Sequence, residues 1–301
     1  MTVSPGPAQP GLTARVGVIG LGLVGRALAA RAAAGGCTVL GFDVSDAAAA
    51  QARALGVTLL PDTIRLAGSC EVLLVCVFDD AQLAEVSGQL AHAAADGAAP
   101  ALVINAATCS PQAADAAAAQ MTRHAIAFME MPLSGSSAQI RDGEALALIG
   151  AEPATLARFQ PLIDLLSPTQ FHVGPPGAAA RAKLASNLVL GLNRAALAEG
   201  LALAEGLGID GGLFLDLLRR SPAYSRAVDT VGPRMVSRDF RPQSRLRQHR
   251  KDLALILAQA ATIPQALPLS EAHAALLDRA IALGLGESDN AAVIAALTAG
   301  G

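Results

Sequence analysis

Apolar and polar positions follow two different patterns along the chain. From Arg15 to about Val173, short runs rich in Val, Ile and Leu alternate with Ala-rich segments of helical periodicity. The apolar runs predict strands at Val16–Ile19, Val39–Phe42, Val72–Val77, Leu102–Asn105, Ala127–Met129 and Leu146–Ile149. Strands separated by helices imply right-handed crossovers. We therefore expect an α/β, Rossmann-like, doubly wound and mainly parallel sheet.

The pattern changes at Gly174-Pro175-Pro176-Gly177, and every later segment is typical of helix. We expect a disordered leader over residues 1–13, a dinucleotide-binding domain over 14–175 and an all-α domain over 176–301. A long helix from Ala178 to about Leu207 would join the two domains. It is apolar on nearly all sides, so it should be buried between domains or in a subunit interface. Further helices are predicted at Leu213–Arg220, Arg226–Val236, Arg250–Ala261, Leu269–Leu283 and Asn290–Leu297.

Composition removes several classes of function. The 301 residues carry a formal charge of −3, which gives no basic field for nucleic acid or an anionic membrane. No run reaches the roughly 18 apolar residues of a spanning helix, and the leader lacks the pattern of a signal peptide. The four cysteines show no C-x-x-C spacing and the five histidines no H-x-x-x-H pair. We expect no metal site and a reducing, cytoplasmic setting.

A glycine-rich turn follows the first predicted strand. Gly20-Leu21-Gly22-Leu23-Val24-Gly25 matches G-x-G-x-x-G and opens an Ala-rich helix. These glycines permit a tight turn, close approach of the backbone to a pyrophosphate, and close packing of helix on strand. Asp43 ends the next strand, 18 residues beyond Gly25. A carboxylate there accepts hydrogen bonds from ribose hydroxyls and repels a 2′-phosphate, which favours NAD over NADP. A turn residue that ends a strand is the alternative for Asp43.

Two later stretches carry candidate chemistry. Lys183-Leu184-Ala185-Ser186-Asn187 places a lysine and an asparagine on one helix face among apolar residues. A desolvated lysine has a tunable pKa, as a group that transfers a proton to or from a hydroxyl requires. Glu130-Met131-Pro132-Leu133-Ser134-Gly135-Ser136 ends a predicted strand. Its small residues offer backbone N–H groups and a hydroxyl to a carboxylate.

Taken in order, these motifs resemble the β-hydroxyacid dehydrogenase family, within the 6-phosphogluconate dehydrogenase superfamily. The family includes 3-hydroxyisobutyrate dehydrogenases, 2-hydroxy-3-oxopropionate reductases and L-threonate dehydrogenases. The resemblance runs from Arg15 to Leu297. Residues 131–135 are similar to its substrate-binding stretch, and residues 174–187 to its G-x-x-G-x-G-x-x-x-K-x-x-x-N segment. Lys251-Asp252-Leu253 resembles its C-terminal K-D-L motif.

The resemblance implies a role for each matching residue. Lys183 would be the general acid/base, and Asn187 would orient the substrate or the lysine. Ser134, Gly135 and Ser136 would hold the substrate carboxylate. Lys251 would close the site near substrate and cofactor. The cofactor would contact residues 20–25 (Gly20, Leu21, Gly22, Leu23, Val24 and Gly25) together with Asp43, Val77 and Thr108.

The sequence departs from the family at several positions. Asn105-Ala106-Ala107-Thr108-Cys109-Ser110-Pro111 stands where the family has D-x-S-T-x-S-P, so Ala107 lacks a hydroxyl. Ser136 and Ala179 each replace a glycine. The run Arg245 to Arg250 precedes Lys251 where apolar residues are usual. Its cations either shape a polar or anionic substrate site or form an exposed, charged helix start.

These observations favour an NAD-dependent oxidoreductase of short β-hydroxyacids or their semialdehydes. Polar acids of three or four carbons, such as glycerate, tartronate semialdehyde or threonate, are favoured over 3-hydroxyisobutyrate. A homodimer or homotetramer is expected. One alternative is an imine reductase on the same fold, although such enzymes usually carry another residue at the position of Lys183. The other alternative is a non-catalytic NAD-binding module, which the substitutions at Ala107, Ser136 and Ala179 would favour.

Overall fold

The computed structural model describes residues 14–298, so the predicted leader lies outside the described residues. The chain divides into two compact units, unit 1 over residues 1–181 and unit 2 over residues 182–301. The boundary predicted at residue 175 lies just before helix α8 (Ala178–Gly206), and the division into units lies within that helix. α8 therefore starts in unit 1 and continues through unit 2.

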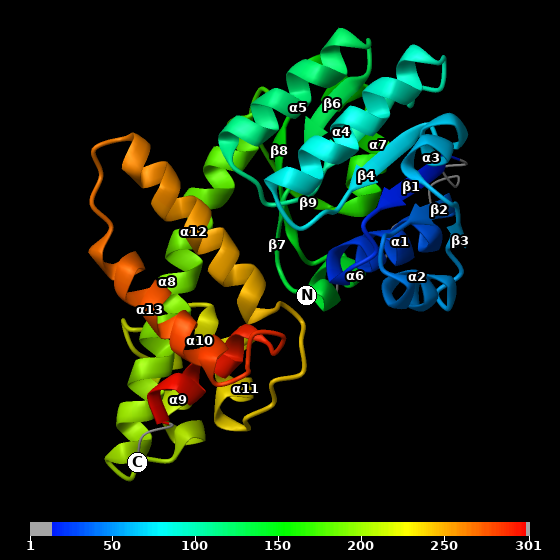
Figure 1. The fold of residues 1–301 in the computed structure, drawn as a ribbon. Helices are drawn as coiled ribbons and strands as arrows, with labels where there is room; N and C mark the ends of the chain where they lie inside the picture. The colour runs from blue at the N-terminus through cyan, green and yellow to red at the C-terminus, as the bar shows by residue number, and fades with distance from the viewer. Residues whose placement is uncertain (1–13, 299–301) are drawn as a thin grey trace. The chain divides into compact units, whose positions relative to one another are not determined.

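Within residues 14–181, the strands form one mainly parallel sheet, as predicted (Figure 1). They are β1 (Arg15–Ile19), β2 (Thr38–Phe42), β3 (Thr58–Leu59), β4 (Val72–Val75), β5 (Leu102–Asn105), β6 (Ala127–Glu130), β7 (Leu133–Ser134), β8 (Leu146–Gly150) and β9 (Thr169–Gly174). Their order is β3-β2-β1-β4-β5-β6-β8-β7, with β9 paired to β8. The strands from β3 to β6 are parallel, whereas β8 is antiparallel to β6 and β7.

Helices cover both faces of this sheet. They are α1 (Leu23–Ala34), α2 (Asp46–Arg53), α3 (Thr63–Ser69), α4 (Asp80–Ala95), α5 (Pro111–Arg123), α6 (Ser137–Asp142) and α7 (Pro153–Leu166). One buried cluster includes Val16, Leu28 and Ile163, and a second includes Leu73, Leu90 and Met121. Since Val72 and Leu73 belong to different clusters, alternate residues of β4 face opposite sides of the sheet.

Short polar side chains start many of these helices. Ser45, Asp62, Asp79 and Ser110 each accept a hydrogen bond from the backbone N–H three residues later, at the start of α2, α3, α4 and α5. Such a cap satisfies one of the free amides of a first helical turn. α1 differs, because Gly22 precedes it and gives no side-chain cap.

Within its described residues, unit 2 consists of helices joined by loops. After α8 come α9 (Gly211–Arg219), α10 (Ala227–Thr230), α11 (Gly232–Val236), α12 (Leu246–Thr262), α13 (Pro268–Ala282), the 3₁₀ turn η1 (Asn290–Ile294) and α14 (Ala295–Thr298). Its core includes Leu197, Leu253 and Leu277. No helix within residues 14–298 is long and apolar enough to cross a membrane.

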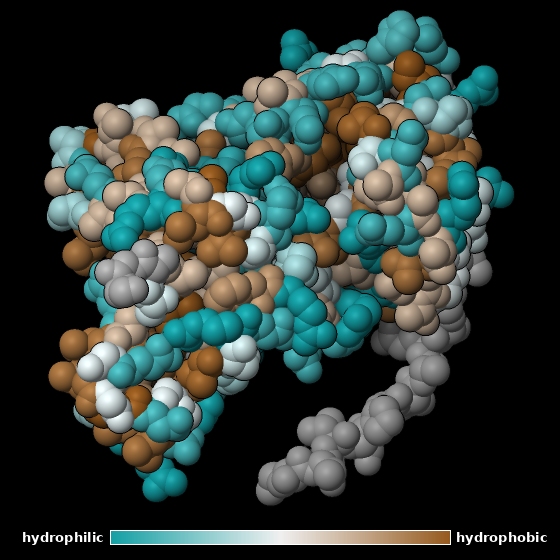
Figure 2. All heavy atoms as spheres, turned by 60° about the horizontal axis from the view of Figure 1, so that its bottom comes forward, coloured by the Kyte–Doolittle hydropathy of each residue, from teal (hydrophilic) through white to brown (hydrophobic). Residues whose placement is uncertain are grey.

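Several predicted helices of unit 2 differ from the structure: α12 begins four residues before the predicted Arg250, and the helix expected over Asn290–Leu297 is η1 followed by α14. The single helix expected over Arg226–Val236 is two short helices, because Pro233 stands at the start of α11 and cannot continue α10. α8 matches its prediction in length, and Val189 and Leu203 on it are exposed in the single chain. Figure 2 shows hydrophobic residues reaching the surface among polar ones.

Candidate active site

The glycine turn after β1 has the geometry of a dinucleotide-binding loop. Gly20 has φ +88°, and a Cβ there would lie 2.5 Å from the carbonyl oxygen of Cys76. A Cβ on Gly25 would lie 1.9 Å from the carbonyl oxygen of Gly20. Both positions therefore require glycine for reasons internal to the protein. A Cβ on Gly22 would meet nothing within 4 Å, so space remains where a pyrophosphate would approach the first turn of α1.

Asp43 holds the glycine turn from the end of β2. Its two carboxylate oxygens accept hydrogen bonds from the backbone N–H of Leu21, at 2.5 Å, and of Ser45, at 2.7 Å. Arg26 donates to the carbonyl oxygen of Leu21 at 2.6 Å, which holds the same turn from the helix side. Asp43 is therefore a turn residue, and its contact with the ribose of the cofactor stays a prediction.

The remaining predicted cofactor residues lie beyond the carboxyl ends of the parallel strands. Val77 follows β4 and Thr108 follows β5, on strands adjacent to β1 and to each other. Ligands of open parallel sheets bind at this edge. Asn105 shapes the loop that carries Thr108, since its side-chain oxygen accepts a hydrogen bond from the backbone N–H of Ala107 at 3.1 Å. This turn is closed without a hydroxyl at position 107.

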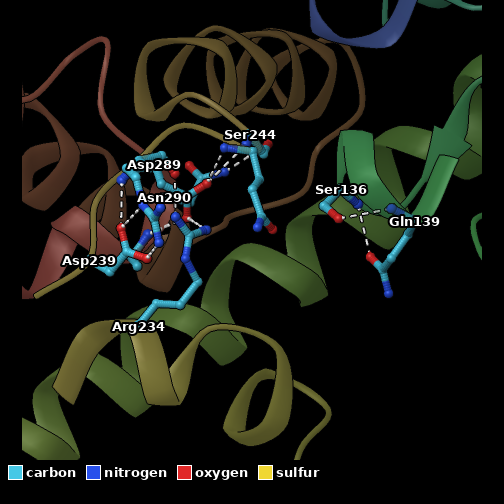
Figure 3. Close-up of polar contacts among 10 residues, drawn as sticks. Ser136, Gln139, Arg234, Asp239, Ser244, Asp289 and Asn290 are labelled. Carbon is cyan, nitrogen blue, oxygen red and sulfur yellow. Dashed lines mark hydrogen bonds and ion pairs between the residues drawn. The ribbon is translucent and has the colours of Figure 1, made fainter. Parts of the chain in front are cut away.

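The predicted carboxylate-binding stretch forms β7 and the start of α6. Ser134 lies in β7, and a Cβ on Gly135 would lie 2.8 Å from Cβ of Ala145, so this glycine packs directly against the residue before β8. Ser136 caps α6: its hydroxyl accepts from the N–H of Gln139, and the Gln139 side chain accepts from the N–H of Ser136 (Figure 3). The extra side chain at position 136 therefore has a capping role.

Glu130 fixes the start of α8 from the end of β6. Its carboxylate is 1% exposed and accepts hydrogen bonds from the backbone N–H of Gly177 (2.5 Å), Ala179 (3.3 Å) and Ala180 (3.0 Å). A carboxylate at this position satisfies free amides and opposes the positive end of the helix. Burial nevertheless raises the pKa of Glu130 above its usual value, against the lowering effect of the three backbone bonds. The sequence motif contained this residue but gave no sign of its role.

Lys183 and Asn187 lie on the same face of α8, one turn apart, and each is 5% exposed. Burial lowers the pKa of Lys183 to about 8, with Asp252 acting in the opposite direction and Arg194 adding to the decrease. An amine with this pKa exchanges its proton near neutral pH. Such a pKa is a property that a general acid/base needs.

Asp252 connects these residues to the predicted Lys251. One of its oxygens accepts from the Asn187 side-chain nitrogen at 3.1 Å, and the other lies 2.9 Å from Nζ of Lys251. Asp252 is itself buried, on α12. The K-D-L motif placed Asp252 in the sequence, but only the pairing of α8 with α12 brings it to Asn187.

The arginines before Lys251 have carboxylate partners at the surface. Arg245 and Arg247 pair with Glu287, and Arg250 pairs with Asp278. These contacts support the exposed, charged helix start of the two interpretations. Leu246 and His249 are the buried members of the run, and His249 is 6% exposed.

A buried carboxylate also holds the loop before α12. Asp289 accepts from the backbone N–H of Gln243 and of Ser244, each at 2.9 Å, and pairs with Arg234 at 2.9 Å (Figure 3). Asn290 donates to the Ser244 hydroxyl at 2.9 Å. This network fixes the turn that leads into α12 and thus the helix that carries Asp252. Within residues 14–298, no group of three or more His, Cys, Asp or Glu side chains could hold a metal ion.

Two family descriptions together match most of the chain. Residues 15–174 match the NAD binding domain of 6-phosphogluconate dehydrogenase. Residues 177–297 match the NAD-binding family of NADP-dependent 3-hydroxyisobutyrate dehydrogenase.

Individual relatives are dehydrogenases and reductases of small acids. The chain is 25% identical over 281 residues to 2-(hydroxymethyl)glutarate dehydrogenase of Eubacterium barkeri, covering 93% of both. It is 26% identical to 2-hydroxy-3-oxopropionate reductase of Escherichia coli strain K12, covering 94% of this chain and 97% of the relative. The solved 3-hydroxyisobutyrate dehydrogenase of Mycobacterium tuberculosis with L-serine has a TM-score of 0.83 at 26% identity. That match covers 95% of this chain and 99% of that one.

The contacts of Glu130 predict a graded effect of substitution on stability. Glu130→Ala leaves the three amides without their acceptor, so we expect a loss of about 3 kcal/mol in the free energy of unfolding. Glu130→Gln keeps an acceptor oxygen and should cost less. Because the pKa is raised in the folded state, the stability contribution of Glu130 is present at low pH and is lost as pH rises through that pKa. Urea unfolding from pH 4 to 8 measures this, and a wild-type advantage over Glu130→Gln that grows with pH would contradict it.

The Asp252 carboxylate is the group that raises the pKa of Lys183 against burial. Asp252→Asn should therefore lower the pKa of Lys183 below about 8. The chain has two lysines, so NMR titration of ¹³C-methylated lysines, assigned with Lys183→Met, gives the value directly. Asp278→Asn, which removes an exposed carboxylate of unit 2, is the control. An unchanged or higher pKa in Asp252→Asn would show that this carboxylate does not act on the amine.

Proposed function

We propose, from the membership of the chain in the β-hydroxyacid dehydrogenase family, that it is an NAD-dependent oxidoreductase of short β-hydroxyacids or their semialdehydes. The observation that carries the proposal is the buried Lys183, with a pKa near 8, beside Asn187. Family membership already makes the chain a dehydrogenase that acts on CH–OH groups. The amine adds the acid/base group that such a reaction needs.

In the proposed reaction, the neutral Lys183 amine accepts the proton of the substrate hydroxyl during oxidation. In reduction, the Lys183 ammonium returns a proton to the oxygen of the aldehyde. Asn187 is oriented by Asp252 and holds the same oxygen. Residues 20–25 with Asp43, Val77 and Thr108 hold the cofactor, which when bound accepts or supplies the hydride. Ser134, Gly135 and Ser136 are proposed to bind the substrate carboxylate, and Lys251 is proposed to lie near substrate and cofactor.

We favour polar acids of three or four carbons as substrates. Relatives named as 2-hydroxy-3-oxopropionate reductase and L-threonate dehydrogenase support this choice. The paired surface arginines no longer contribute to it.

We also propose a homodimer or homotetramer that covers the apolar surface of unit 2. Leu203 on α8, Leu207 directly after it, and Leu213 and Leu217 on α9 are each more than half exposed in the single chain. Apolar side chains gathered on neighbouring helices usually mark a protein interface. Sedimentation velocity tests this, and a monomer at micromolar concentration would contradict it. The free cysteines (Cys37, Cys70, Cys76 and Cys109) support a reducing, cytoplasmic setting, which localisation of a tagged chain would check.

The lysine predicts opposite pH profiles for the two directions of reaction. Oxidation needs the neutral amine, so kcat/KM should rise about tenfold per pH unit below pH 8 and level off above it. Reduction needs the ammonium, so its rate should fall above pH 8. Initial rates at 340 nm on a panel of β-hydroxyacids and semialdehydes measure both.

Lys183 variants separate the chemistry from binding. Lys183→Met should lower kcat by about 10³-fold or more, and Lys183→Arg should not restore it, because a guanidinium does not release its proton. NAD binding, followed by calorimetry, should remain. Full activity of Lys183→Met would remove the proposed acid/base. Turnover of 3-hydroxyisobutyrate alone would overturn the choice of polar substrates.

Asp43 predicts the cofactor. Wild-type kcat/KM should be about 100-fold higher with NAD than with NADP, because a carboxylate repels the 2′-phosphate. Asp43→Asn keeps one acceptor for the turn and should narrow this ratio at least about tenfold. Asp46→Asn, an exposed neighbour in the first turn of α2, serves as the matched control. A preference for NADP in the wild type would contradict the choice of cofactor.

A further inference from the structure

Gly191 marks a very close approach between α8 and two buried histidines. A Cβ atom on Gly191 would lie 2.6 Å from Nε2 of His249 and 2.9 Å from Cε1 of His273. These distances leave no room for a methyl group. His249 comes from α12 and His273 from α13, and they are 6% and 4% exposed. Glycine at position 191 therefore creates a notch in α8 that two imidazole rings fill.

The notch lies one turn from the contact between Asn187 and Asp252. Gly191 follows Asn187 by four residues on α8, and His249 precedes Asp252 by three residues on α12. α8 and α12 thus make two successive contacts. The first is the 3.1 Å hydrogen bond between Asn187 and Asp252, and the second is the packing of the His249 ring against the backbone at Gly191. A hydrogen bond tolerates only a few tenths of an ångström of change. The separation of α8 and α12 at the ring contact therefore controls whether this bond forms.

The two rings occupy this space without adding charge. Their centroids are 5.1 Å apart and their planes are inclined by 45°. Burial holds the pKa of His249 well below its usual value, and Arg194, His273 and Lys183 lower it further. Burial and Arg194 lower the pKa of His273 to about 4. At neutral pH, neither ring competes with Lys183 for the Asp252 carboxylate.

Packing, rather than hydrogen bonding, explains the position of His249. Its Nε2 atom is buried and has no hydrogen-bond partner within the described part of the chain. A buried polar atom without a partner is costly, so the ring needs a compensating reason to be there. The contact with Gly191 supplies a steric reason.

We propose that the Gly191 notch and the His249–His273 ring pair form a spacer that positions Asp252, and through it Asn187 and Lys183. These are positioning residues, since they act through the Asp252 contact. The inference rests on the proposed function for its kinetic consequences only. Its geometric part concerns the contact between two helices and can be measured without any substrate.

Gly191→Ala tests the spacer directly. Alanine is the better helix former, so a purely local view predicts a protein at least as stable and as active as the wild type. If the spacer positions Asp252, the added methyl forces α12 away. In that case kcat should fall at least about tenfold, while KM for NAD stays within about twofold of the wild type. Gly200→Ala is the matched control on the same helix, because its Cβ would meet Phe214 at an ordinary 3.5 Å.

A compensating substitution separates positioning from general damage. His249→Ala removes the ring that the new methyl meets, so Gly191→Ala/His249→Ala should recover most of the kcat lost in Gly191→Ala. His249→Ala alone leaves the notch empty and should also lower kcat. If Gly191→Ala fails to fold, the double variant is compared with His249→Ala. A kcat of the double variant equal to or higher than that of His249→Ala supports the spacer, and a lower kcat than that of His249→Ala overturns it.

The pKa of Lys183 distinguishes failure of the spacer from failure of the proposed function. Moving Asp252 away removes a group that raises this pKa, so Gly191→Ala should lower it and the double variant should restore it. ¹³C NMR titration of the methylated lysines measures the pKa of Lys183 in each variant and needs no enzymatic activity. If the wild type is inactive but the pKa of Lys183 changes as expected in the two variants, the proposed reaction is wrong and the spacer is supported. Wild-type kcat and an unchanged pKa in Gly191→Ala would overturn the spacer.

Discussion

A buried ammonium group needs a nearby anion, and in unit 2 the group that meets this need for Lys183 is the Asp252 carboxylate. Lys183 is 5% exposed on a largely apolar helix, where burial alone lowers its pKa. Asp252 opposes that decrease, and the balance leaves the pKa at about 8. A lysine without this carboxylate would lose its proton at a lower pH, and a lysine in water would keep it to a much higher pH. A carboxylate on α12 therefore acts on the pKa of a group on α8.

Other buried or half-buried carboxylates have a different task, which is to fix backbone. Asp43 binds two amides around the glycine turn, and Glu130 binds three at the start of α8. Asp289 binds two amides of the loop before α12 and pairs with Arg234. Asp252, by contrast, contacts side chains. The carboxylates that fix backbone hold the loops and helix starts, and the carboxylate that faces side chains raises the pKa of Lys183.

Much of the fold could be predicted because its signals are local. The glycine turn, the apolar strands and the change of pattern near residue 175 all depend on residues close in sequence. β3 and β7 are two residues long, too short to show a period, and β9 is largely half-buried or exposed. The roles of Asp252 and His249 depend on the pairing of α8 with α12, which joins residues 65 apart. No local pattern reports such a contact.

The departures from the family pattern are accommodated by their surroundings. Asn105 closes the turn at Ala107, and Ser136 caps α6. A Cβ on Gly150 would lie 3.1 Å from the methyl of Ala179. The glycine at position 150 therefore leaves room for the methyl group at position 179, where the family has glycine. Random decay of a site would leave cavities or unpaired polar groups at such positions. Each substitution here instead has a compensating neighbour, which weakens the argument for a non-catalytic module built on these three positions.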